Sequence, residues 1–310
     1  MNWQPSANLQ VIRERARIYR QIRSFFNNRG CLEVETPVLA STTNTDVQVS
    51  TIEVPGFDIP FYLQTSPEFA MKRLLAVGCG SIFQISHAFR QGETGRLHHP
   101  EFSLLEWYRT GYDYQQLMDE MELLITTLSL HQCSFTRITY KALFKEVMNL
   151  VVDEVALPEL RNHCAKSVPG TKAEEYDFDQ CLDLLLGVVI APTMRGYQFV
   201  YDYPLSQAAL ARVREDDNSV AERFELFFDG IELANGFSEL TDADEQRARF
   251  EQDSAARAQK GLPQYAIDER LLAALESGLD DCAGVALGLD RLLMVLLELD
   301  SIDQVLTFTV

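Results

Sequence analysis

The chain has few basic residues and no long apolar run. Its 27 Lys and Arg face 46 Asp and Glu, which leaves a net charge of −19 over 310 residues. Proteins that hold long stretches of RNA backbone normally carry a basic patch, so this balance argues against extensive tRNA binding. No apolar run is long enough for a membrane span, and the starting segment MNWQPSANLQ has no apolar signal. We therefore expect a cytoplasmic protein without a membrane segment.

Paired cysteines are also missing. The six cysteines form no C-x-x-C pair and are scattered along the chain: Cys31, Cys79, Cys133, Cys164, Cys181 and Cys282. Zinc sites usually cluster their ligands and disulfide frameworks are typical of secreted proteins, so this spacing favours reduced core thiols. With 46% hydrophobic residues, the chain can bury a large core as one large domain or two small ones.

The stretch SHAFRQGETGRLHHPEFSLLEWY, residues 86–108, has the strongest chemical signal. Two apolar, β-prone segments flank a polar loop, a pattern that predicts two antiparallel strands joined by a mobile connection. Arg90 ends the first strand, and the loop holds three further cations: Arg96, His98 and His99. A guanidinium can bind two phosphate oxygens while loop cations close over the rest, so the stretch suits a polyphosphate. The alternative is an ordinary hairpin with a solvated tip.

Carboxylates recur at two other places. In the segment TSPE, Thr65 and Glu68 have capping-box spacing and Pro67 falls in the first turn of the predicted helix. Glu232 and Glu239 lie on and after the second strand of a predicted hairpin. Two carboxylates beside arginines suit Mg²⁺ bound to nucleotide phosphates, whereas the alternative is a pair of solvated edge residues.

Small residues alternate near the end of the chain. Gly284, Ala286 and Gly288 share one face of a predicted strand, so a flat ligand can lie against that face. An apolar helix begins at Leu289 and places Arg291 in its first turn, where the cation can meet a phosphate.

These stretches resemble the three motifs of class II aminoacyl-tRNA synthetases, in the form of the lysine-specific branch. Residues 22–39, with GCLEVETPVL, resemble motif 1, and residues 82–108, with F-R-x-x-E, H-x-P-E-F and LEWY, resemble motif 2. Residues 284–299, with GVALGLDRLL, resemble motif 3, and 139–190 resembles the helical insertion between motifs 2 and 3. The resemblance implies an α+β fold, with a central antiparallel sheet flanked by helices. It implies a single catalytic domain over 1–310, without the anticodon-binding β-barrel of the lysine enzymes.

The resemblance also implies the roles of individual residues. The catalytic residues would be Arg90 on the α-phosphate, Arg291 on the γ-phosphate, and Glu239. The amino acid would contact Ser66, Pro67, Glu68, Tyr108, Glu239 and Ala286. ATP would contact Arg90, Gln91, Gly92, Glu93, His99, Phe102, Glu232, Leu233, Gly288 and Arg291. Glu232 and Glu239 would hold Mg²⁺.

Three positions depart from the pattern of the lysine branch. Gly92 stands where the family has a glutamate that touches adenine, so either the loop shifts to bring in Glu93 or a water replaces the contact. His99 replaces an asparagine. Ala286 replaces a glycine, and its methyl group would push on the α-carbon region of a bound lysine.

Ala286, the missing anticodon domain and the stretch ELANGF together resemble a subfamily of ligases. Its members activate (R)-β-lysine with ATP and Mg²⁺ as an adenylate and transfer it to the ε-amino group of a lysine on elongation factor P. Motif 1 implies a homodimer. The alternatives are a lysyl-adenylate enzyme acting on tRNA or another amine, and a catalytically inactive paralogue that senses an amino acid. A biosynthetic amide synthetase lacks support in the LEWY and ELANGF stretches.

Overall fold

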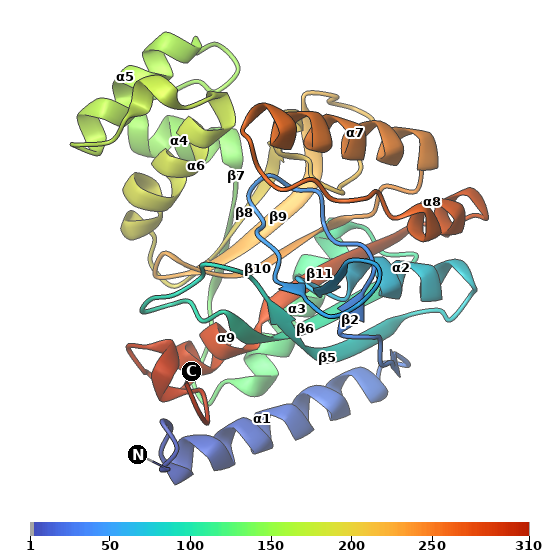
Figure 1. Cartoon of the computed structure of the whole chain (residues 1–310). Helices are drawn as coiled ribbons and strands as arrows, with labels where there is room; N and C mark the ends of the chain where they lie inside the picture. The colour runs from blue at the N-terminus through green and yellow to red at the C-terminus, as the bar shows by residue number, and fades with distance from the viewer. Residues whose placement is uncertain (1–2, 310) are drawn as a thin grey trace. The chain divides into compact units, whose positions relative to one another are not determined.

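The computed structural model describes residues 3–309, which form two compact units. One unit consists of the chain up to 131 and from 238 onward, and the other of residues 132–237. Each unit combines helices with mainly antiparallel strands, which confirms the predicted α+β class (Figure 1). Within the described residues, no helix is long and apolar enough to cross a membrane.

The first unit is built on four strands in the order β1-β5-β6-β11. β1 runs parallel to β5, and the β5–β6 and β6–β11 pairs are antiparallel. A small second sheet has the order β2-β4-β3. The elements are α1 (Leu9–Asn27), β1 (Leu32–Glu33), β2 (Leu39–Ala40), β3 (Glu53–Val54), β4 (Phe61–Leu63), α2 (Glu68–Ala76), β5 (Ile82–Phe89), β6 (Glu101–Thr110), α3 (Tyr114–Leu128), α7 (Ala243–Gln259), α8 (Glu269–Glu276), β11 (Cys282–Gly288), α9 (Leu289–Leu296) and η5 (Ile302–Gln304).

The second unit has its own four strands in the order β10-β9-β8-β7, and it contains the predicted helical insertion. Its β9–β10 hairpin turns at Asp229 and Gly230, both with positive φ, as that turn signal predicts. The elements are β7 (Phe135–Thr139), α4 (Tyr140–Met148), α5 (Leu157–Ser167), η1 (Ala173–Glu175), α6 (Phe178–Leu185), η2 (Leu186–Ile190), η3 (Ala191–Thr193), β8 (Tyr197–Pro204), η4 (Leu205–Gln207), β9 (Val220–Phe228) and β10 (Ile231–Ser238).

The helix of motif 1, α1, lies along the strands of the first unit (Figure 1). The Asn8 side chain accepts a hydrogen bond from the Val11 amide and so caps its start. Its apolar face is buried, and the Phe26 ring stacks on Phe83 of β5 with 4.8 Å between centroids. Gly30, with φ of +73°, ends the helix and lets the chain turn into β1.

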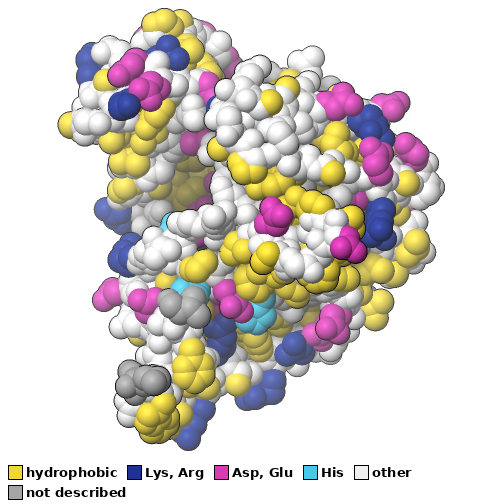
Figure 2. All heavy atoms as spheres, in the orientation of Figure 1, with side chains coloured by type: hydrophobic (Ala, Val, Ile, Leu, Met, Phe, Trp, Pro, Cys, Tyr) yellow, Lys and Arg dark blue, Asp and Glu magenta, His cyan; other side chains and the backbone are white. Residues whose placement is uncertain are grey.

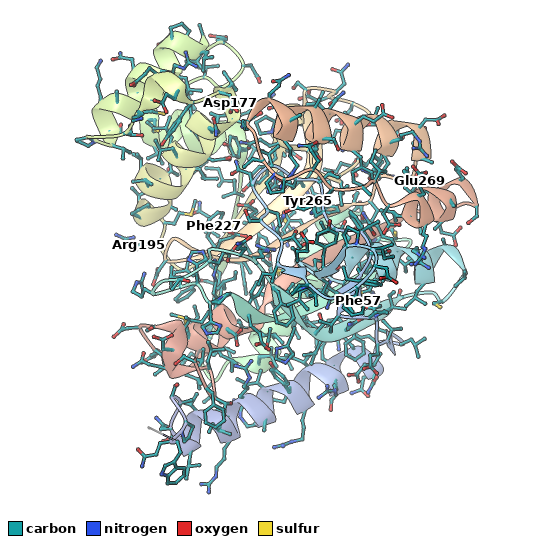
Figure 3. All side chains as sticks on the ribbon, viewed as in Figure 1. Phe57, Asp177, Arg195, Phe227, Tyr265 and Glu269 are labelled. Atoms are coloured by element: carbon teal, nitrogen blue, oxygen red, sulfur yellow. The ribbon has the colours of Figure 1, made fainter. Side chains whose placement is uncertain are left out.

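A buried arginine anchors the loop before β3 to α7. The Arg257 guanidinium donates to the carbonyl oxygens of Asp46 and Pro263, each at 2.8 Å. It also lies 4.3 Å from the centroid of the Tyr265 ring, and Figure 3 labels this tyrosine. Because these contacts satisfy the donors of a buried cation, they fix a loop that would otherwise carry unpaired backbone carbonyls.

All six cysteines are free thiols, and four of them are buried, which agrees with the prediction of core thiols: Cys31, Cys164, Cys181 and Cys282. Burial raises the pKa of each of these thiols. They therefore act as small apolar side chains in the core.

One buried ion pair joins the helices of motifs 1 and 3. The Arg15 Nη1 atom of α1 lies 2.7 Å from Oδ1 of Asp290, the second residue of α9. The other Asp290 oxygen accepts from the backbone amide of Ser103 on β6 at 2.7 Å. Only 2% of the Asp290 side chain is exposed, so its charge depends on these partners.

Removing the arginine should leave this carboxylate buried without its counter-ion. We expect Arg15→Met to lower the free energy of unfolding by about 3 to 5 kcal/mol, measured by urea denaturation. Arg17→Met is the matched control, because Arg17 pairs at 2.6 Å with Glu14, and both side chains are partly exposed. It should cost less than about 1 kcal/mol. Equal losses in the two variants would contradict the anchoring role of Asp290.

Candidate active site

The predicted amino-acid residues gather on one face of the β6–β11 pair. In this ladder Glu106 lies opposite Ala286, and Tyr108 lies opposite Gly284. Side chains alternate along a strand, so these four positions share a face with Gly288. Ala286 and Gly288 are only half-buried, which leaves that end of the face open to a ligand.

Gly284 marks the place where this face is tightest. A Cβ atom built on it would lie 2.3 Å from Cε1 of Tyr108 and 2.4 Å from Oε1 of Glu239. Its φ is not in the left-handed region, so the requirement for glycine is steric. The tyrosine ring and the carboxylate occupy the space that any side chain here would need.

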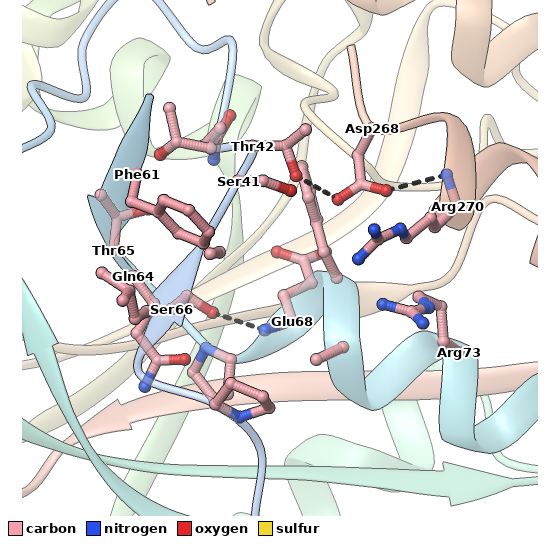
Figure 4. Close-up of a pocket in the computed structure, with 18 of the residues that line it drawn as sticks. Ser41, Thr42, Phe61, Gln64, Thr65, Ser66, Glu68, Arg73, Asp268 and Arg270 are labelled. Atoms are coloured by element: carbon pink, nitrogen blue, oxygen red, sulfur yellow. Dashed lines mark hydrogen bonds between the residues drawn. The ribbon is translucent and has the colours of Figure 1, made fainter. Parts of the chain in front are cut away.

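The start of α2 does not form the predicted capping box. Helix α2 begins at Glu68 after Pro67, and the Glu68 amide donates to the Ser66 Oγ atom at 3.1 Å (Figure 4). Proline at the cap position sets a turn that brings Ser66, rather than Thr65, to this amide. The Ser66 hydroxyl in turn donates to Oε2 of Glu106 at 2.7 Å.

Glu106, in the LEWY stretch, is a site residue that sequence reasoning did not assign. Its Oε1 atom accepts from the Tyr108 hydroxyl at 2.7 Å, and its Oε2 atom accepts from Ser66. Only 2% of Glu106 is exposed. A carboxylate opposite Ala286 and bonded to two predicted contacts belongs to the same site, and period-2 alternation with Tyr108 was the signal for it.

A second unassigned residue, Lys72, lies at the centre of the site. Its Nζ atom is 2.7 Å from Oε1 of Glu68, one turn earlier on α2, and 2.6 Å from Oε2 of Glu239. The lysine and Glu239 side chains are each 1% exposed. The Oε1 atom of Glu239 is buried and has no hydrogen-bond partner. The spacing of Glu68 and Lys72, four residues apart on a helix, was the only sequence signal for this contact. We call Glu68, Lys72, Glu106, Tyr108 and Glu239 the amine cradle.

Two carboxylates of the amine cradle, Glu106 and Glu239, are buried, and burial raises the pKa of each. Burial, reinforced by the charge of Glu68, raises the pKa of Glu106 to about 7. Burial also raises the pKa of Glu239 to about 8, where Lys72 opposes the rise and Glu68 adds to it. The nearby carboxylates raise the pKa of Lys72 despite its burial, so the lysine is a cation. Such a site attracts further positive charge.

A cavity of about 260 Å³ opens beside the start of α2 (Figure 4). It includes three of the predicted amino-acid contacts, namely Ser66, Pro67 and Glu68. On its far side Thr42 donates to Asp268 at 2.5 Å, and this aspartate also caps α8. A cavity of this size fits a small polar molecule rather than a large one.

The predicted phosphate ligand Arg90 follows directly after β5. Its guanidinium lies over the Phe102 ring, 5.2 Å from the centroid, and Nη1 is 3.5 Å from Oε1 of Glu93. Its Nε atom is buried without a hydrogen-bond partner. Gly92 has φ of +84°, a conformation that favours glycine, and the turn directs Glu93 back toward Arg90.

The loop between β5 and β6 is attached to motif 3 and the segment after it. The Arg291 Nη2 atom lies 2.8 Å from Nε2 of His98, and its Nε atom donates to the Leu97 carbonyl at 3.3 Å. Arg96 donates to the Asp300 carbonyl at 3.0 Å. These contacts hold Arg291 and Arg96 in place. The cations that are predicted to close over a nucleotide are therefore already part of the folded structure.

The remaining predicted ATP contacts fall into two groups. The His99 ring is buried, and its Nδ1 atom lies 2.7 Å from the backbone oxygen of Glu101, so the ring supports the start of β6. The Gln91 amide donates to the Ser50 carbonyl at 2.8 Å. Glu232, which is exposed, and Leu233, which is buried, belong to the second unit on β10.

Glu232 has a charged environment of its own in the second unit. The neighbouring strand β9 carries Arg223 and Glu225, whose side chains form an ion pair at 2.5 Å. Burial raises the pKa of Glu225 to about 7, and the charge of Glu232 adds to the rise. Arg223 also donates to the side chain of Asn235 at 3.0 Å. The ELANGF stretch is thus bonded to a buried cation.

The family comparison agrees with this geometry. The family model of the class II tRNA synthetases (D, K and N) matches residues 1–310. The chain belongs to this family.

Curated relatives give a narrower similarity. The chain is 47% identical to the elongation factor P–(R)-β-lysine ligase of Vibrio parahaemolyticus, across 99% of this chain and 98% of that protein. It is 48% identical to the enzyme of the same name from Vibrio campbellii, across 99% of this chain and 97% of that protein. The enzyme of that name from Klebsiella pneumoniae is 45% identical across 99% and 97% of the two chains.

A methyl group at Gly284 should block the amine cradle. We expect Gly284→Ala to raise the amino-acid KM in pyrophosphate exchange at least about tenfold, which corresponds to ~1.4 kcal/mol. Overpacking should also cost about 1 to 3 kcal/mol of stability. Gly187→Ala is the control, because nothing lies within 4 Å of its added Cβ atom. An unchanged KM in Gly284→Ala would place the amino acid elsewhere.

The raised pKa of Glu106 predicts how stability depends on pH. Between its ordinary value of 4.5 and about 7, the folded state holds a proton that the unfolded state has lost. The free energy of unfolding should therefore fall as the pH rises through this window, by at most about 1.4 kcal/mol per unit. Glu106→Gln cannot ionise, so urea midpoints should show it gaining stability relative to wild type between pH 5 and pH 8. If the urea midpoints of wild type and Glu106→Gln changed with pH in parallel, the result would contradict a raised pKa for the buried Glu106 carboxyl.

Proposed function

We propose that the chain activates (R)-β-lysine with ATP as an aminoacyl adenylate and transfers it to the ε-amino group of a lysine on elongation factor P. The observation that carries this proposal is 47% identity, along 99% of this chain, to an enzyme named for that reaction. The amine cradle supplies the matching chemistry, because buried carboxylates favour a substrate with positive charge. The relatives' name supports the acceptor, and the residues of the site support the amino acid.

The amine cradle would recognise the amino groups of the substrate. Glu239 keeps one buried oxygen without a hydrogen-bond partner, and the Tyr108 hydroxyl lies beside it on Glu106. An ammonium group placed there would satisfy an acceptor that is costly to leave unpaired. Ser66, Pro67 and Glu68 line the adjoining cavity and would enclose the remainder of the molecule.

Ala286 would select the β-amino acid. Its half-buried methyl group lies on the ligand face opposite Glu106, where glycine in the lysine-specific enzymes would leave more room. One methyl group in a pocket discriminates by about 1 to 3 kcal/mol. Moving the amino group from the α- to the β-carbon leaves the α-carbon as a slimmer CH₂ group, which suits this position.

ATP would bind at the arginines of motifs 2 and 3. Arg90 has a buried Nε–H without a hydrogen-bond partner and would hold the α-phosphate, and Arg291 would hold the γ-phosphate. Phe102 and Gly288 offer a flat, open surface beside them for the base. The other proposed contacts with ATP are Gln91, Gly92, Glu93, His99, Glu232 and Leu233.

Mg²⁺ would be held by Glu232 and Glu239. Within residues 3–309, no cluster of three or more His, Cys, Asp or Glu side chains is placed to hold a metal. This fits Mg²⁺, which commonly binds through one or two carboxylates together with substrate phosphates. Glu232 and Glu239 both carry carboxylates, which are hard oxygen donors of the type that Mg²⁺ prefers. When bound, the metal would supply charge neutralisation at the phosphates.

The chemistry needs positioning and charge stabilisation rather than a protein nucleophile. A carboxylate oxygen of the amino acid attacks the α-phosphorus of ATP, and pyrophosphate leaves with the electron pair of the broken P–O bond. The mixed anhydride is then attacked by the uncharged amine of the acceptor lysine, which loses a proton as AMP leaves. Arg90 and Arg291 would align the phosphates and stabilise the developing charge.

We further propose a cytoplasmic homodimer that associates through motif 1 and does not depend on tRNA. Leu32 on β1 and Val38 before β2 are exposed apolar side chains in the motif 1 segment. On the face drawn in Figure 2, Lys and Arg side chains form small separate groups among acidic ones. A surface that binds a long stretch of RNA backbone would instead carry its Lys and Arg side chains in one continuous patch.

The test is amino-acid-dependent exchange of pyrophosphate into ATP, with (R)-β-lysine, (S)-β-lysine and α-lysine under one set of conditions. We expect wild type to prefer (R)-β-lysine. Ala286→Gly should shift the ratio toward α-lysine by about tenfold or more, because it removes the discriminating methyl group.

Three outcomes would overturn parts of the proposal. Preference of wild type for α-lysine would indicate a lysyl-adenylate enzyme with tRNA or another amine as acceptor. No exchange with any of the three would indicate a binding protein that has lost catalysis. An unchanged ratio in Ala286→Gly would remove this residue from the basis of selection.

A further inference from the structure

We propose that Lys72 is a positioning residue of the amino-acid site: its buried ammonium group holds the carboxylates of Glu68 and Glu239 in the orientation that the substrate needs. This inference rests on the proposed function in that it takes the amine cradle as the site where a cationic amino acid binds. It assigns a role to a residue that does not itself contact the reacting atoms.

Lys72 lies between the carboxylates of Glu68 and Glu239. Its Nζ atom lies 2.7 Å from Oε1 of Glu68 and 2.6 Å from Oε2 of Glu239, so it contacts one oxygen of each. The second oxygen of Glu239 remains buried and without a hydrogen-bond partner. A lysine bound to one oxygen therefore orients the other toward a ligand, much as a hydrogen-bond partner orients a side chain that binds a metal.

The surroundings of Lys72 carry an excess of negative charge. Lys72 interacts with ionisable groups from four segments, namely Glu68 on α2, Glu106 on β6, Glu239 after β10, and Cys282 on β11. Three carboxyl groups thus face a single ammonium group. Without it, the carboxylates would repel one another and move apart, and the free oxygen of Glu239 would lose its orientation.

Stability alone does not explain a lysine at this place. Taking a charged side chain fully out of water costs several kcal/mol, and buried ion pairs replaced by apolar residues are often neutral or stabilising. Met71 and Leu75 on the same helix are buried apolar residues, so α2 already packs through such side chains. A fully buried lysine among substrate-binding carboxylates is therefore better explained by binding.

The first test is Lys72→Met, which keeps the length of the side chain and removes its charge. We expect KM for the amino acid to rise by about 100-fold, the scale of a misplaced positioning group, while ATP affinity stays within a factor of about two. The value of kcat at saturating amino acid should fall much less than KM rises, because the lysine orients binding groups and does not touch the reacting atoms. Lys172→Met is the control, since its exposed ion pair with Glu175 at 3.1 Å is of the same chemical type.

The second test separates charge from packing. In Lys72→Ala, added n-propylammonium should restore amino-acid affinity, whereas n-propanol, which fills the same volume without charge, should not. Equal rescue by the two would make Lys72 a packing residue and overturn the proposal. So would wild-type affinity for the amino acid in Lys72→Met. Variants that neither bind ATP nor melt cooperatively, with or without propylammonium, would mark a folding role and also overturn it.

These experiments distinguish a failure of the proposed role of Lys72 from a failure of the proposed function. If wild type activates α-lysine rather than (R)-β-lysine, the proposed function fails, and the Lys72 experiments are run with α-lysine instead. If wild type prefers (R)-β-lysine and Lys72→Met behaves like wild type, only the role of Lys72 fails.

Discussion

The site depends on one buried ammonium group, that of Lys72, which lies between the carboxylates of Glu68 and Glu239. Glu68, Glu106 and Glu239 meet where α2 lies against strands β6 and β11, and Lys72 lies among them. Burial of carboxylates is costly, and here the cost is offset by one ammonium group and two hydroxyl donors. We propose that the negative charge that remains attracts the amino groups of the substrate.

This constraint determines which residues can surround the carboxylates. Gly284 must lack a side chain, because the Tyr108 ring and the Glu239 carboxylate fill its space. Further along the same strand, Ala286 and Gly288 keep the surface low where a ligand must lie. Asp290, at the start of α9, fixes the end of this strand. Its carboxylate pairs with Arg15 of α1 and accepts a hydrogen bond from the Ser103 amide of β6. Asp290 of motif 3 therefore connects the second strand of motif 2 with the helix that leads into motif 1.

The sequence predicted what local pattern and motif resemblance determine. The β5–β6 hairpin, the turn at Asp229 and the small-residue face of β11 all follow from short-range rules, and the structure confirms them. The capping box at Thr65 was wrong because a proline at the cap position changed which hydroxyl meets the helix amide. Residue preferences and spacing do not define the first residue of a helix to within one position.

The residues of the amine cradle show why part of the candidate site could not be predicted from the sequence. Lys72 and Glu106 appear in sequence as an ordinary helix residue and an ordinary strand residue, and only the pairing of distant segments brings them together. Glu239 comes from a third segment, far along the chain. Contacts of this kind depend on tertiary structure, so a buried lysine within a charged helix start carries no local signature of its own. The loop from Arg90 to His98 was predicted as mobile, and its attachment to Arg291 is likewise a long-range contact.

The central claim is tested most directly by the mass of elongation factor P after incubation with the protein, ATP and (R)-β-lysine. The account predicts that one lysine of elongation factor P gains a single β-lysyl group, and that the gain disappears when this lysine is replaced by arginine. An unmodified elongation factor P, under conditions in which the protein forms the adenylate, would contradict the account and place the acceptor in another class of amine.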